Sequence, residues 1–198
     1  MKMKYLLTAI CLTVVLQCAV VAQSPWKASD YKPEPYRKVM VLAKISDMSA
    51  RQQLEDRTVK LLNDKGIAAM AAYSSIKPSR ATSREAFLAI ADSLRVDALV
   101  VYSVNGAEKQ VQQTATLSVG VGVGMYGGFA GTSVPIAGGA KMVTFVKLTV
   151  DFFNRASKDE QWSMQLGGSL ADGTDKLAYT LAKTTVKAMI KDKLFVLK

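Results

Sequence analysis

The stretch VMVLAKISDMSARQQLEDRTVKLLNDKG, residues 39–66, decides the fold of this chain. It opens with the apolar run Val39–Ile45, which is broken by a single lysine and is typical of a strand covered on both faces. Ser49 and Gln52 then form a capping box, and apolar residues recur at helical spacing until Gly66, where a glycine commonly ends a helix. The stretch therefore predicts a strand followed by a helix.

The same alternation continues along the chain. Residues 67–76 predict a second strand, and a second capping box, Thr82 with Glu85, opens a helix with its own apolar stripe. Residues 98–104 predict a third strand. Strands and helices that alternate at this spacing favour a sheet with parallel members joined by right-handed crossovers.

After residue 104 the pattern changes to strands without helices between them. Strands are predicted at residues 112–119, 141–153 and 161–166, and the last two are separated by a charged turn that favours a hairpin. A final helix is predicted at residues 175–191. The expected fold class is therefore α/β: a single domain with a mixed sheet, a strand–helix–strand–helix–strand start, a late β-hairpin and a terminal helix.

The amino-terminal residues predict export. In residues 1–22, two lysines precede a short apolar run and small residues end at Ala22, as in a signal peptide. A lipoprotein is the alternative, because Cys18 closes the apolar run. Residues 23–37 contain three prolines and are predicted to be a linker to an envelope domain at residues 38–198. The expected location is the periplasm, with association to the outer membrane as a second option.

The composition argues against an enzyme. The chain has no histidine, and its two cysteines, Cys11 and Cys18, both lie in the predicted leader. A mature chain would lack an imidazole base, a thiolate and the soft ligands of zinc, iron or copper sites. We therefore expect no catalytic residues, no cofactor and no metal; a glycan hydrolase that uses two carboxylates is a minor alternative.

A glycine-rich segment, residues 119–139, contains the literal motif G-x-G-x-x-G at 122–127. No helix can follow it, because more glycines and then a proline come next, so a nucleotide site is not expected. The segment is predicted to be a loop. It is either a passive connection or, through Met125, Tyr126 and Phe129, a contact with a partner or a membrane.

The positive charge of the chain indicates either general solubility or attraction to an anionic partner. The net charge is +10, and Lys183, Lys187 and Lys191 repeat every four residues on the polar side of the last helix. In an exported protein such a face is either solvated or in contact with an anionic cell-surface component, rather than with nucleic acid.

The order of elements resembles a group of small bacterial envelope proteins. Similar members are the curli-secretion lipoprotein, the lipoprotein activators of penicillin-binding proteins and the amino-terminal domain of TolB. The likeness rests on Val150–Asp151 before the late turn, Gln161–Ser163 after it, and residues 50–66. Residues 50–66 are also similar to uncharacterised envelope lipoproteins with an Arg-x-x-x-Glu-Asp helix, here Arg51, Glu55 and Asp56. The resemblance implies an interaction module, often oligomeric or bound to a partner, without a catalytic site.

These observations predict a non-enzymatic exported protein that binds another envelope protein or the cell-wall or membrane surface. The alternative is a subunit of an oligomeric transport or secretion assembly, which would make the protein a homo-oligomer. Peripheral contact with a membrane is compatible with either function.

Overall fold

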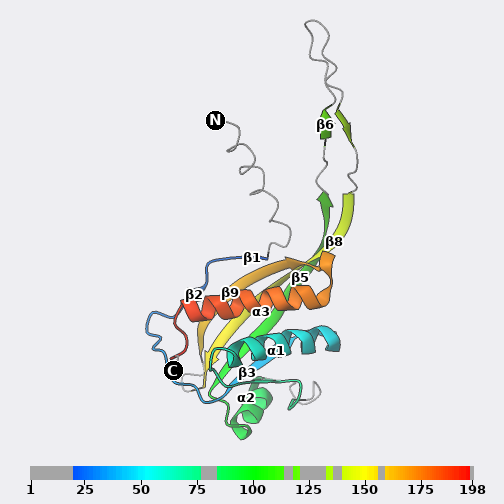
Figure 1. The fold of residues 1–198 in the computed structure, drawn as a ribbon. Helices are drawn as coiled ribbons and strands as arrows, with labels where there is room; N and C mark the ends of the chain where they lie inside the picture. Colours follow the sequence, from blue (N-terminus) through cyan, green and yellow to red (C-terminus); the bar gives the residue numbers. More distant parts are fainter. Residues whose placement is uncertain are drawn as a thin grey trace, which may run out of the picture.

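A computed structural model of the chain describes residues 20–76, 84–113, 118–120, 133–135, 140–155 and 159–196 (Figure 1). A mixed seven-stranded sheet has the order β1-β9-β8-β5-β3-β4, and β2 also pairs with β9. The strands are β1 (Val21–Ala22), β2 (Trp26–Lys27), β3 (Val39–Lys44), β4 (Ala69–Ala71), β5 (Ala98–Gln113), β6 (Ser118–Gly120), β7 (Ser133–Pro135), β8 (Ala140–Asn154) and β9 (Glu160–Ser169). The helices are α1 (Met48–Asn63), α2 (Arg84–Ser93) and α3 (Thr174–Lys191), with a 3-10 turn at Leu170–Asp172. The predicted single-domain α/β fold with a mixed sheet is confirmed.

Strand β3 is buried on both faces, as its apolar run predicts. It runs parallel to β4 on one side and to β5 on the other. Val39 and Val41 pack in one cluster with residues of α1 and α3, while Met40 and Leu42 pack in a second cluster with Ala91 of α2. Alternate residues of a strand point to opposite faces, so α1 and α3 cover one face of the sheet and α2 covers the other.

The start of α1 differs from the prediction. Asp47 caps the helix, with its carboxylate accepting a hydrogen bond from the Ala50 N–H at 2.7 Å. The predicted capping box at Ser49 is wrong, because Asp47 is an equally good cap and its negative charge also favours the helix amino terminus. Gly66 has the positive φ of +77° expected after the carboxyl end of the helix.

The strand predicted at 67–76 is much shorter than expected. Only β4, Ala69–Ala71, pairs with β3, and the chain then turns. Ile76 is buried in the α2 cluster without belonging to a strand, so its apolar character reflects burial and not strand pairing. Thr82 of the predicted second capping box lies outside the described residues.

Strands β5 and β8 pair with each other beyond the point where their other neighbours in the sheet end. The strands predicted at 98–104 and 112–119 are separate in the prediction, but β5 is continuous to Gln113, with a bulge between Val104 and Gly106. Its pairing with β8 extends to Gln113 opposite Ala140, whereas β9 pairs with β8 only as far as Phe145. The remaining paired part, residues 109–113 with 140–144, projects from the body and is called the arm (Figure 1).

The predicted loop at residues 119–139 is in part a strand pair. Ser118–Gly120 (β6) pairs antiparallel with Ser133–Pro135 (β7), which corrects the prediction at those residues. Alternating valine with small residues can form a strand when an antiparallel neighbour supplies the hydrogen bonds. Met125, Tyr126 and Phe129 lie outside the described residues.

The residues predicted to be a linker pack on the body of the domain. Trp26–Lys27 pairs with β9, and the buried Tyr31 hydroxyl donates a 2.6 Å hydrogen bond to the Leu194 carbonyl. Val21 and Ala22, the last two residues of the predicted signal peptide, pair with Gly167 and Leu166 of β9. Residues 1–19 lie outside the described part, and the cleavage site stays a prediction.

The late hairpin and the terminal helix lie as predicted. β8 and β9 are antiparallel neighbours, and the inward side of α3 is buried against the sheet. Trp162 of β9 is fully buried, and its indole Nε1 donates to Asp192 Oδ2 at 2.7 Å just after α3. Within the described residues, no helix has the length and apolar character needed to cross a membrane.

Candidate functional site

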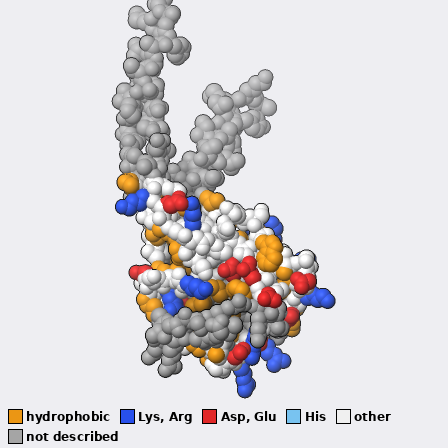
Figure 2. Space-filling model, turned by 180° about the vertical axis from the view of Figure 1, so that it is seen from behind, with side chains coloured by type: hydrophobic (Ala, Val, Ile, Leu, Met, Phe, Trp, Pro, Cys, Tyr) orange, Lys and Arg blue, Asp and Glu red, His pale blue; other side chains and the backbone are white. Residues whose placement is uncertain are grey.

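On the second face of the sheet α2 covers β3 and the start of β5, and no helix of the described residues lies over β8 and β9. Leu42 and Val101 are buried there in the cluster that includes Ala91 of α2, while Asp151 and Ser163, next in the same row across the sheet, are only half-buried. We call the uncovered part the open face. It comprises Thr149, Asp151, Glu160, Ser163 and Gln165, and is bounded by Phe153, which packs against the α2 cluster, and by Trp26 at the outer edge. Figure 2 shows the molecule from this side, where several acidic side chains gather among uncharged and hydrophobic ones.

Two carboxylates lie together on the open face. Ser163 Oγ donates a 2.7 Å hydrogen bond to Asp151 Oδ1. The pKa of Glu160 is raised, first by partial burial and then by the negative charge of Asp151, while a hydrogen bond with Ser163 acts in the opposite direction. Within the described residues neither carboxylate forms an ion pair.

An exposed tryptophan borders these carboxylates. Trp26 lies directly opposite Ser163 in the β2–β9 pair, and residues so placed project from the same face. Its side chain is 52% exposed, whereas Lys27 points to the other face and donates to the Asp192 carbonyl. A half-exposed indole beside an acidic group suits contact with a basic side chain or an apolar part of a protein.

The predicted lysine stripe lies on the outer side of α3. Lys183, Lys187 and Lys191 are all exposed, and none of them forms an ion pair within the described residues. The Lys183 ammonium lies 5.7 Å from the centre of the Tyr179 ring. We call these three lysines with Tyr179 the lysine face. Its position away from the core agrees with the sequence pattern, and its contact with an anionic surface stays a prediction.

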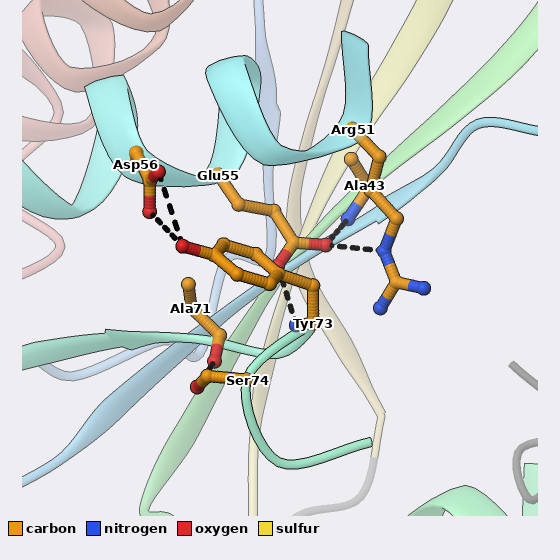
Figure 3. Close-up of polar contacts among 7 residues, drawn as sticks. All are labelled: Ala43, Arg51, Glu55, Asp56, Ala71, Tyr73 and Ser74. Carbon is orange, nitrogen blue, oxygen red and sulfur yellow. Dashed lines mark hydrogen bonds and ion pairs between the residues drawn. The ribbon is translucent and has the colours of Figure 1, made fainter. Parts of the chain in front are cut away.

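A third polar cluster lies at the carboxyl ends of β3 and β4 (Figure 3). Glu55 of α1 is fully buried; its Oε1 accepts from the Ala43 N–H at 2.9 Å and from Arg51 Nε at 2.8 Å, and its Oε2 accepts from the Tyr73 N–H at 2.8 Å. The Tyr73 hydroxyl also donates to both oxygens of Asp56, at 2.9 and 3.1 Å. Glu55 thus ties α1 to the ends of two strands.

This cluster occupies the place where open α/β sheets commonly bind ligands, outside neighbouring strands whose helices leave toward opposite faces. Three hydrogen bonds and full burial leave the Glu55 carboxylate no room to act on a substrate, so its role is structural. The sequence marked Arg51, Glu55 and Asp56 through a resemblance but not Tyr73. The i, i+4 spacing of Arg51 and Glu55 on the inward side of the helix indicates, from the sequence, a buried ion pair between them.

The described residues hold no cluster of three or more acidic, histidine or cysteine side chains that could bind a metal ion.

The predicted contact residues fall into two groups. The three lysines lie together on α3, on the opposite side of the sheet from the open face, and the three apolar residues of the glycine-rich segment are outside the described part. The sequence did not mark the open face, although the alternation of polar and apolar residues in β8 and β9 is its signal.

No protein-family model matches this sequence, and no curated protein matches it. The chain is similar to two solved structures of the PelC dodecamer from Paraburkholderia phytofirmans, one of which carries a point substitution. Each is 15% identical with a TM-score of 0.47, covering 87% of this chain and 98% of the variant or 97% of the other chain. The lipoprotein GNA1162 from Neisseria meningitidis is 13% identical with a TM-score of 0.42, covering 78% of this chain and 98% of that one. The function of this chain therefore has to follow from its own residues.

Proposed function

We propose that this protein is a non-enzymatic component of the bacterial cell envelope that binds other protein chains as a subunit of an assembly. The observation that carries the proposal is the open face. In the described part of the chain no helix lies over half of one side of the sheet, and that half carries two carboxylates without an ion pair among the described residues and a 52% exposed tryptophan. Aromatic residues that stay exposed beside uncompensated charge are typical of protein-binding surfaces.

The arm supports the same proposal. Residues 109–113 pair with 140–144, and no other strand among the described residues pairs with either segment. A two-stranded ribbon that leaves its domain buries little surface and exposes both edges, so a neighbouring chain is a natural source of further contacts. The envelope location rests on the predicted leader.

Light scattering of the purified mature protein tests the proposal. We expect a mass that is a multiple of the chain mass, stable over a wide range of concentration. A monomer at every concentration up to the millimolar range would contradict the assembly. Intact mass spectrometry of the same sample identifies the amino terminus, either Gln23 or an acylated Cys18.

Binding to an anionic surface is the second candidate function, favoured by the lysine face. Sedimentation with vesicles that contain anionic lipid tests it. Binding that is lost in a Lys183→Glu, Lys187→Glu, Lys191→Glu variant would support this function, while equal sedimentation of both proteins would exclude the lysine face as the contact.

A variant with residues 120–138 replaced by a tight turn tests whether the segment beyond the arm contributes to association. We expect it to fold, because the seven-stranded sheet ends before that segment. Loss of association in a folded variant would assign the contact to the segment that contains Met125, Tyr126 and Phe129.

A further inference from the structure

We propose that copies of this chain associate head to tail, with the lysine face of one copy seated on the open face of the next. This inference rests on the proposed function and names its interface. The two surfaces belong to different elements, α3 and the β8–β9 pair, and carry opposite charge.

The dimensions of the two surfaces match. β8 and β9 with the adjoining β2 present a strip about 10 Å wide, since neighbouring strands lie about 4.8 Å apart. That is about the diameter of one helix with its side chains. Lys183 to Lys191 spans about 12 Å along α3, and Thr149 to Phe153 spans about 14 Å along β8. A helix from a second copy would therefore complete the layer that α2 begins.

The chemistry of the two surfaces is also complementary. The lysine ammonium groups lack carboxylate partners, and Asp151 and Glu160 lack cations, within the described residues. The ring of Trp26 is exposed at the edge, where a lysine stem can pack on it and its ammonium can lie over the ring. Pairing the two surfaces supplies on each copy an ion partner to the charged groups that have none among the described residues of that copy.

The position of the surfaces determines the kind of assembly. The open face and α3 lie on opposite sides of the sheet, so one molecule can use both surfaces at once. Such a contact is heterologous and adds copies in one direction, to give a ring or a filament rather than a two-fold dimer.

Charge reversal tests this interface. One variant carries Lys183→Glu, Lys187→Glu and Lys191→Glu; the other carries Asp151→Lys and Glu160→Lys. Each alone is expected to be monomeric at concentrations where the wild type is assembled, with association weakened at least tenfold. Lys32→Glu with Lys65→Glu is the control, because both lysines are exposed and lie on neither α3, β2, β8 nor β9; it is expected to assemble as the wild type does.

The rescue is specific to a head-to-tail contact. An equimolar mixture of the two variants has two compatible pairs of surfaces, because each surface of one variant is opposite in charge to its counterpart on the other. The mixture is expected to assemble with alternating copies, and a single chain carrying all five changes is expected to assemble alone. Thermal unfolding confirms that each variant is folded. If a reversal variant fails to fold, Trp26→Ala and the neutral pair Asp151→Asn, Glu160→Gln replace it, with weakened association expected.

The outcomes separate this inference from the proposed function. A monomeric wild type contradicts both. An assembled wild type whose variants all stay assembled, or whose variants dissociate without rescue in the mixture and in the five-fold variant, overturns this interface and leaves the assembly standing. Binding of a lysine-rich peptide to a monomeric wild type would also overturn it in favour of another basic partner.

Discussion

One row of residues crosses the sheet from a closed half to an open half. Leu42 on β3 and Val101 on β5 are 8% and 5% exposed, and their neighbours in the row, Asp151 on β8 and Ser163 on β9, are half-buried and polar. Trp26 on β2 ends the row at 52% exposed. All five side chains project from the same face of the sheet, so the change follows the edge of the α2 layer.

The two halves of the sheet differ in which of their faces are apolar. In the closed half both faces are apolar, as strands between two helix layers require. In the open half only the face under α3 is apolar, and the other face keeps polar side chains that are available for contact. We therefore expect substitutions on this face to reduce stability in the closed half and to alter association in the open half.

The largest difference is expected when the same charge is placed in each half. Leu42→Lys buries an unpaired ammonium and should reduce the free energy of unfolding by more than about 4 kcal/mol. Gln165→Lys, exposed on the same face, should change it by less than about 1 kcal/mol. Urea unfolding of both variants measures the comparison, and equal losses would mean that a layer also covers the open half.

The apolar face of the open half should be as sensitive as the closed half. Trp162 is fully buried and bonded to Asp192, so Trp162→Ala should cost about 3 to 5 kcal/mol. Trp26→Ala is the matched control, because its ring is half-exposed and should contribute far less to folding. An unchanged unfolding midpoint for Trp162→Ala would contradict the packing of α3 on β9.

The Glu55 cluster of the closed half should respond to a neutral replacement. Glu55→Gln keeps the shape of the side chain but removes the charge that Arg51 faces, and we expect a loss of about 2 to 3 kcal/mol. Asp56→Asn, one residue away and exposed, should cost less than about 1 kcal/mol. Similar losses at the two positions would rule out the structural role of Glu55.

The smallest effect is expected at Glu160 and depends on pH. Its raised pKa means that the folded state holds the proton more tightly than the unfolded chain, so the stability it contributes is complete at low pH and is lost as pH rises through the raised pKa. Glu160→Gln should match the wild type below about pH 4 and be slightly more stable at pH 7. The difference should shrink in an Asp151→Asn background, and unfolding midpoints at the two pH values measure it.

Much of the fold could be predicted because local patterns matched the tertiary environment. The unbroken apolar run of β3, the alternation in β8 and the helical stripe of α3 each indicate which faces are covered. The lysine face followed from the same periodicity, since charges that repeat on the polar side of a buried helix must point outward.

Other features depend on contacts between distant segments. The polar residues after Val104 have turn composition, and they form a strand because residues 140–147 of β8 supply the hydrogen bonds. Tyr31 looks like part of a proline-rich linker until the Leu194 carbonyl and Phe152 ring are placed beside it. A local window contains neither partner.

The amino-acid sequence was sufficient for the class of fold, the order of its main elements and the side of α3 that carries charge, because periodicity reports local burial. The tertiary arrangement was needed for the arm, for the buried tie through Glu55 and for the open face. Each of these depends on which strands become neighbours and on how far a helix layer extends over them, and those are properties of residues distant in the sequence.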